Sequence, residues 1–398
     1  MISLLQKSKD YFVYIQVENS EVIFQLFRFQ ERAYDAVLIK IKSTSGDFKN
    51  AESLGSVLTE YINEAKKIPN CRIIIGLHSG LFSTAQTTIT LRREDPRRII
   101  DETELENLVS SGLWKVFSRE QKDLARKMNI PEADAVFAGA LIPQVRVDGH
   151  RVASPVGFTA HTVEFTVLYS VSSRAIYHLL ASLIFGETEV YCTEIGMSEL
   201  LRLADLNNLN DFLLMRVSET HTYIYASSED NLTYVDTIAW GRNSLIGALV
   251  NELMMSRPQA IELMHRADIG LTSGHVRRRL ESLLLQEVSV LLKGIGAHVV
   301  EGKSKAVYVS APFSLPAALF GEAAARRSGT IIPVIALPDN SRGEKSQSAL
   351  PLSMKTTASS ISALCANAWA ANRSFEKNDL HKMTKRRARW LASDSTSS

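Results

Sequence analysis

The sequence has few of the features that mark disulfide, metal or membrane-spanning proteins. Its 398 residues include three cysteines, which are far apart and show no Cys-x-x-Cys spacing (Cys71, Cys192 and Cys365). Free thiols of this kind are typical of a reducing compartment. The histidines show no metal-ligand spacing, no stretch approaches the roughly 20 apolar residues of a spanning helix, and the N-terminus lacks the apolar run of a signal peptide. We therefore expect a cytoplasmic protein without a metal site, whose membrane contact, if any, is peripheral.

An excess of charge of one sign is also missing. The formal net charge is +2, with 45 basic and 43 acidic residues, so the bulk of the surface gives no case for nucleic acid as a partner. Apolar residues make up 45% of the chain and charged residues 22%, which is ordinary for a globular protein. The length is sufficient for two or three domains with their own cores.

Two parts of the chain repeat one pattern of strands followed by helices. β-branched and aromatic runs near the start predict three strands, namely Tyr11–Val17, Val22–Arg28 and Ala36–Ile41. An amphipathic helix and a strand over Arg72–Leu77 follow. Three more strands begin near residue 211, namely Phe212–Val217, Thr222–Ala226 and Leu232–Ala239. Helices follow these as well, so we expect two related α/β halves.

Residues 78–173 interrupt this repeat with a strand, a helix and two more strands. The strands are predicted at Thr87–Leu91, Ala138–Val147 and Val163–Tyr169. Asp101 can cap the helix while Glu104 reaches back to it, as in a capping box. An Asp148-Gly149 turn follows the second strand. We expect residues 118–135, which are mostly polar, to form a surface excursion.

Three short motifs in this module carry a family resemblance. They are Leu141-Ile142-Pro143, Val147-Asp148-Gly149 and Pro155-Val156-Gly157. They resemble the insertion domain of FtsA, the actin-like bacterial division protein, and the related module of PilM, a pilus-platform protein. The resemblance implies a two-lobed α/β fold of the actin-like ATPase (ribonuclease H-like) type, with an inserted strand–helix–strand–strand module. It divides the chain into a first lobe (1–77 and 174–207, closed by a helix at 358–372), the module (78–173), a second lobe (208–340), a loop (341–357) and a basic, flexible tail (373–398).

The resemblance also implies where a nucleotide would bind. Active members hold phosphates with two hairpin turns, which carry an Asp for Mg²⁺ and glycines that let backbone N–H groups approach the phosphate oxygens. A glycine-rich segment after a later strand takes the adenosine. The corresponding positions here are Gln16, Glu18 and Ser20 in the first turn, Arg216, Ser218 and Thr222 in the second, and Ala311 and Pro312 in the third segment.

These residues depart from the pattern at all three places. Glu18 puts a negative charge where phosphates would lie, and Ala311 with Pro312 would obstruct an adenine. We therefore expect no bound cofactor, with Mg-ATP disfavoured, and we identify no catalytic residue. Two alternatives stay open: Arg216 could bind a phosphate directly without metal, and the chain could be an ATPase or small-molecule kinase with an atypical site.

A basic segment lies near the C-terminus. Its members are Lys382, Lys385, Arg386, Arg387 and Arg389, followed by Trp390 and Leu391. FtsA-like proteins end in an amphipathic helix that lies at the inner membrane, and each Lys or Arg near an anionic surface contributes about 1 kcal/mol. We predict that this segment contacts the inner membrane. A merely solvated tail, or a contact with nucleic acid, is the alternative.

The resemblance therefore favours an FtsA-like scaffold, a pseudo-ATPase that links a cell-division or cytoskeletal partner to the inner membrane. The expected partner is a tubulin-like division protein, and self-association would strengthen a weak tail contact. A PilM-like platform for type IV pili, which would bind a peptide of a membrane protein, is the alternative.

Overall fold

The computed structural model describes most of the chain up to residue 311 and a few residues beyond it. The described residues are 11–19, 21–29, 36–48, 51–184, 190–207, 211–228, 231–268, 271–301, 306–311, 313, 315, 334–336, 383, 384 and 386. The predicted closing helix, the 341–357 loop and most of the basic segment lie outside them. Contacts divide the chain into two compact units, the first made of Met1–Arg202, Asp230–Tyr234 and Ala363–Ser398, and the second of Leu203–Glu229 and Val235–Ser362. Among the described helices, none is long and apolar enough to cross a membrane.

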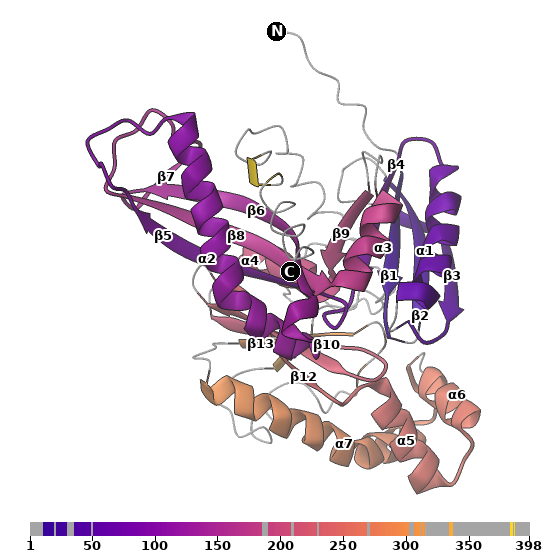
Figure 1. Cartoon of the computed structure of the whole chain (residues 1–398). Coiled ribbons are helices and arrows are strands. Elements are labelled where there is room, and N and C mark those ends of the chain that lie inside the picture. Colours follow the sequence, from indigo (N-terminus) through magenta and orange to yellow (C-terminus); the bar gives the residue numbers. More distant parts are fainter. Residues whose placement is uncertain are drawn as a thin grey trace. The chain divides into compact units, whose positions relative to one another are not determined.

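The first unit contains a five-stranded mixed sheet, visible in Figure 1. Its strand order is β3 (Ala36–Ser45), β2 (Glu21–Phe29), β1 (Tyr11–Val17), β4 (Cys71–Leu77) and β9 (Val190–Glu194). Strand β1 runs antiparallel to β2 and parallel to β4. Helices α1 (Ala51–Lys66) and α3 (Arg174–Ile184) bury apolar side chains against this sheet in one core cluster, as periodic apolar positions on a helix require.

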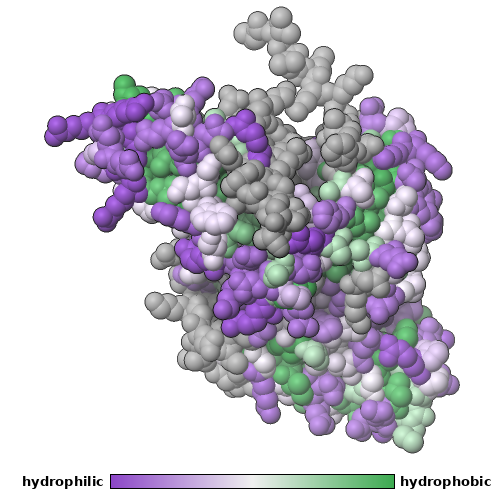
Figure 2. All heavy atoms as spheres, viewed as in Figure 1, coloured by the Kyte–Doolittle hydropathy of each residue, from purple (hydrophilic) through white to green (hydrophobic). Residues whose placement is uncertain are grey.

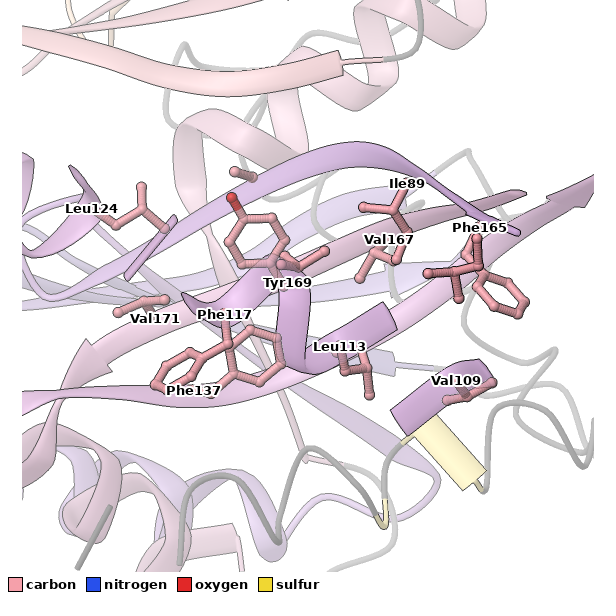
Figure 3. Close-up of a cluster of buried hydrophobic side chains, with 14 of the residues drawn as sticks. Ile89, Val109, Leu113, Phe117, Leu124, Phe137, Phe165, Val167, Tyr169 and Val171 are labelled. Carbon is pink, nitrogen blue, oxygen red and sulfur yellow. The ribbon is translucent and has the colours of Figure 1, made fainter. Parts of the chain in front are cut away.

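The inserted module is a sheet covered by one long helix. The elements are β5 (Phe82–Arg92), α2 (Glu102–Met128), the short 3₁₀ helix η1 (Glu132–Asp134), β6 (Ala135–Val147), β7 (His150–Val152) and β8 (Thr162–Ser173). Strand β8 lies between β5 and β6 and is antiparallel to both. Phe137 joins the helix to the sheet, with its ring 5.4 Å from that of Phe117 on α2 and stacked 5.8 Å from that of Tyr169 on β8 (Figure 3). This burial raises the pKa of the Tyr169 hydroxyl.

The prediction of a surface excursion over residues 118–135 is wrong in its first half. Helix α2 continues to Met128 and buries Leu124, Ala125 and Met128. It ends at Asn129, whose φ of 56° is left-handed, a conformation common after the last helical residue. The polar residues of this stretch lie on its outer side, in keeping with the mostly hydrophilic surface of the module in Figure 2.

The predicted capping box is half formed. The Asp101 carboxylate accepts a hydrogen bond of 2.8 Å from the Glu104 backbone N–H, which lowers the pKa of Asp101. The Glu104 side chain instead binds the buried guanidinium of Arg93, at 2.7 and 2.8 Å. Arg93 also donates to the Arg98 and Ala160 carbonyls, so this arginine ties two loops of the module together.

The second unit repeats the strand pairing of the first. Its strands are β10 (Phe212–Val217), β11 (Thr222–Ser228), β13 (Ala306–Ser310) and β14 (Val334–Ala336), together with the last residues of β12 (Asn231–Ile238). Strand β10 runs antiparallel to β11 and parallel to β13, as β1 does to β2 and β4. Helices α5 (Arg242–Leu253), α6 (Arg257–Asp268) and α7 (Gly274–Glu301) supply the rest of its core. The remaining helix, α4 (Ile195–Asn207), follows β9.

Candidate functional site

The turn after β1 is filled by two polar side chains of its own. Gln16 and Glu18 are buried, with 0% and 5% of their surface exposed. The Gln16 side-chain amide donates a hydrogen bond of 2.7 Å to the Glu18 carboxylate, and the Glu18 backbone N–H donates to the Glu21 carbonyl at 2.9 Å. The turn therefore has an amide, Gln16, at the position of the expected aspartate and a buried carboxylate, Glu18, at the position of the expected glycine. Ser20, the third predicted residue, lies outside the described residues.

Two more buried polar residues lie near this turn, at the carboxyl ends of the parallel strands. Strand register pairs Val17 with Leu77 and Leu77 with Glu194, and His78 follows directly. The His78 backbone N–H donates to the Val17 carbonyl at 3.2 Å. Glu194, fully buried at the end of β9, accepts a hydrogen bond of 2.5 Å from the backbone N–H of Thr84 on β5. Glu194 thus fastens the module to the first sheet.

Sequence reasoning did not identify Glu194 or His78 as part of a site. The available signal was a polar residue directly after an apolar strand, which is weak because most strands end that way. Within the described part of the chain, no group of three or more His, Cys, Asp or Glu side chains could hold a metal ion.

The turn after β10 is closed by hydrogen bonds within itself. The Ser218 backbone N–H and hydroxyl both donate to the His221 carbonyl, at 2.7 and 2.8 Å, and the His221 N–H donates back to the Ser218 hydroxyl at 3.2 Å. Thr222 is buried and donates to the Trp240 carbonyl at 2.8 Å. The Ser218 N–H is therefore already occupied within the turn, whereas a phosphate-binding turn directs such groups at its ligand.

Arg216, at the position of the expected aspartate, is 2% exposed. Burying a guanidinium costs free energy, because the charge loses its hydration, and folded proteins compensate this cost with hydrogen bonds or opposite charges around it. A phosphate could reach this side chain only by displacing the groups that cover it.

The first residues of α5 bind the same turn from outside. The Arg242 N–H donates to the Ser218 carbonyl at 3.1 Å, and the Asn243 N–H donates to the Glu219 carbonyl at 2.8 Å. Gly241 makes this approach possible, because a Cβ at that position would lie 2.6 Å from the Ser218 oxygen. The N–H groups at the start of a helix are a common anion site. In this helix two of them bind turn carbonyls instead.

Side chains add a second connection at this place. The Arg242 guanidinium lies 3.2 Å from a Glu219 carboxylate oxygen and 5.4 Å from the ring centroid of Phe313, which follows β13. Ala311 is partly buried beside this core. Pro312 lies outside the described residues. The second turn and the segment after β13, both predicted to have lost their glycines, are thus joined to α5 by an ion pair and a cation–aromatic contact.

Three residues of the C-terminal basic segment are described, and two of them contact the inserted module. Met383 packs against the module core, Thr384 is fully buried, and Arg386 forms an ion pair with Glu106 of α2. The other predicted membrane contacts lie outside the described residues, namely Lys382, Lys385, Arg387, Arg389, Trp390 and Leu391. Their contact with a membrane stays a prediction.

The sequence matches no family model and no curated protein sequence. Its structure is similar to that of a PilM–PilN type IV pilus biogenesis complex, at 13% identity, with 91% of this chain and 98% of that chain covered and a TM-score of 0.50. It is less similar to the ethanolamine utilization protein EutJ from Carboxydothermus hydrogenoformans (7% identity, 90% and 89% covered, TM-score 0.44). A ROK family glucokinase from Streptomyces griseus, solved with glucose and AMPPNP, is 8% identical, with 91% of this chain and 99% of that chain covered and a TM-score of 0.46.

These likenesses concern the fold. The chain has an α/β fold with mixed sheets, built from two units as the sequence predicts, and it shares this fold with the PilM structure. The identities are too low to carry a function from one protein to another.

Proposed function

We propose that this chain is a scaffold of the actin-like class, which binds a protein partner and does not bind Mg-ATP as active members do. One observation carries the proposal. The N-terminus of α5 donates two backbone hydrogen bonds to the β10–β11 turn, with Gly241 in contact with the turn backbone. In the family, this turn would receive phosphate.

The energetics of opening this turn support the proposal. A ligand that moved α5 away would break both backbone hydrogen bonds, each worth about 0.5–1.5 kcal/mol, and would leave the Ser218 and Glu219 carbonyls without these donors. It would also separate Arg242 from Glu219.

In the first unit, the buried carboxylate of Glu18 disfavours a second negative group nearby. Triphosphate binding would have to exceed these costs without the aspartates that organise Mg²⁺ in active members.

The finer proposal is an FtsA-like tether of the inner membrane. The inserted module, the closed turns and the basic C-terminal segment support it, and its partner would be a tubulin-like division protein. The chain would act in the cytoplasm as a peripheral membrane protein that self-associates.

A PilM-like platform is the second candidate. The similar PilM structure is a complex with PilN and covers 91% of this chain, which favours a peptide of a membrane protein as the partner. The gene neighbourhood distinguishes the two candidates, because a division gene would favour the tether and pilus-assembly genes the platform.

Calorimetric titration of the full chain with ATP and Mg²⁺ tests the absence of nucleotide binding. We expect no saturable heat up to millimolar nucleotide, while an active actin-like ATPase in the same buffer serves as the positive control. Saturation at micromolar ATP would overturn the proposal and favour the remaining alternative, an ATPase or small-molecule kinase with an atypical site.

Sedimentation with anionic liposomes tests the tether. We expect the full chain to pellet with vesicles and the chain without residues 376–398 to stay in the supernatant. Equal pelleting of both proteins would remove the tether and leave the platform.

A further inference from the structure

The contact between the C-terminal basic segment, residues 382–391, and the inserted module joins positions far apart in the sequence. Arg386 binds the carboxylate of Glu106, 280 residues earlier. The Glu106 side chain is 28% exposed although it lies on the outer part of α2, and Arg386 is 65% exposed. The pair therefore lies at the rim of a contact surface, where its charge selects a basic partner and adds modest affinity.

The interior of this contact is apolar. Met383 packs against the cluster that contains the buried α2 residues Val109 and Leu113, and Thr384 has no exposed surface. Figure 3 shows the short yellow segment of the C-terminal region beside α2 at Val109. A partly buried apolar residue, a fully buried neighbour and a charged pair at the edge together match the anatomy of a specific docking site.

We propose that the surface of α2 around Glu106 is a docking site for the basic C-terminal segment of this chain, and that docking withholds the segment from anionic membranes. The second half of the proposal rests on the membrane tether proposed above. In a membrane-bound helix, Met383 would enter the interface and Arg386 would lie at lipid headgroups. Neither can do so while packed on α2, so α2 and the membrane compete for one segment.

Limited trypsin digestion in the absence of lipid tests the docking. Trypsin cleaves after Lys and Arg, which are frequent in the segment, and a docked helix resists cleavage. We expect Glu106→Gln to speed cleavage within residues 382–389 two- to five-fold, and Met383→Asp to speed it more than ten-fold. Glu102→Gln is the matched control, because Glu102 is exposed on the same helix, carries the same charge and makes no ion pair within the described part of the chain.

Liposome sedimentation tests the competition. With vesicles that contain an anionic phospholipid, we expect Glu106→Gln to bind two- to five-fold more tightly than Glu102→Gln, which has the same net charge. Cleavage by trypsin at the control rate in both Glu106→Gln and Met383→Asp overturns the docking site. Faster cleavage with unchanged vesicle binding leaves the docking site and overturns the competition. If the chain without residues 376–398 pellets like the full chain, the tether fails while the docking result still holds.

Discussion

The β1–β2 turn of the first unit and the β10–β11 turn of the second occupy the same place in two copies of one strand pattern. In each unit, the first strand of the hairpin has an antiparallel neighbour on one side and a parallel one on the other. The first turn is filled by the Gln16–Glu18 hydrogen bond. The second is closed by its own Ser218 and by the start of α5. The buried charge is negative in the first turn, at Glu18, and positive in the second, at Arg216.

The two turns are therefore filled in different ways. Side chains of the first hairpin occupy the first turn, whereas the second makes backbone contacts within itself and with the start of α5. Such contacts contribute to stability, so substitutions in the two turns should differ in size and in pH dependence.

The largest effect is expected at the backbone contact of the second turn. Gly241→Ala should lower the free energy of unfolding by about 2–3 kcal/mol, because its Cβ would clash with rigid backbone and not with a movable side chain. Urea unfolding measures the loss. Gly247→Ala on the same helix is the control, since nothing lies within 4 Å of its Cβ, and it should gain about 0.5–1 kcal/mol from helix propensity. Equal losses would show that α5 does not close the turn by contact.

In the first turn, restoring the family's aspartate should be harmful. Gln16→Asp should cost about 1–3 kcal/mol at pH 7, because Glu18 loses its amide donor and gains a second carboxylate beside it. Repulsion raises the pKa of the introduced carboxyl above its unfolded value of about 4. The repulsive part of the penalty is therefore full above the raised folded pKa, shrinks as the pH falls from there towards about 4, and is absent below it. Urea unfolding between pH 3 and 7 measures it, with Gln16→Asn as the uncharged control, which should show no such pH dependence.

The Glu219–Arg242 pair should contribute less. A double-mutant cycle with both residues changed to Ala should give a coupling of about 0.5–1 kcal/mol, since the pair is only partly exposed. Arg277 and Glu281 on α7 are a matched pair with the same 3.2 Å separation and greater exposure. Their coupling should be only about 0.3 kcal/mol. Equal couplings would mean that the lower exposure of the Glu219–Arg242 pair does not strengthen it.

The smallest effect is expected at a turn that kept its predicted chemistry. Asp148 and Gly149 adopt φ values of 45° and 83°, as a hairpin turn of this type requires. Backbone N–H groups of Thr162 and His161 bind the Asp148 carboxylate and lower its pKa. Its contribution is present above the unfolded pKa and is lost as the pH falls through the lower folded value. Asp148→Asn should therefore weaken the fall in the free energy of unfolding below pH 4, as measured by urea unfolding. Glu94→Gln in the same module should leave that fall unchanged.

Strands were easier to predict from the sequence than helix ends. The predicted limits of β1 and β10 agree with the structure to the residue, because each apolar run ends at polar residues. The second half of α2 was missed, since only Leu124, Ala125 and Met128 of its final turns are buried. Strand β7 was missed as well, because its three residues carry no apolar alternation.

The candidate site could be predicted only as a set of positions. Family resemblance pointed to Gln16, Glu18, Arg216 and Ser218, and all four are buried at strand ends. The contacts that close the second turn come from Gly241 and Arg242, more than twenty residues later. No local pattern announces such a contact, just as nothing in the sequence near Glu104 indicates that it binds Arg93 rather than the start of its own helix.

Strands β5 and β8 pair without interruption from Phe82–Ser172 to Arg92–Thr162. At about 3.4 Å per residue, such a ribbon reaches roughly 35 Å. At the end next to the first sheet, the Thr84 backbone N–H donates a hydrogen bond to the Glu194 carboxylate. At the other end, the Arg93 guanidinium donates to the Ala160 carbonyl. A rigid pair of strands attached in this way transmits force. A pull on the loops at its outer end would therefore act on the first sheet directly and would not be absorbed by a flexible linker.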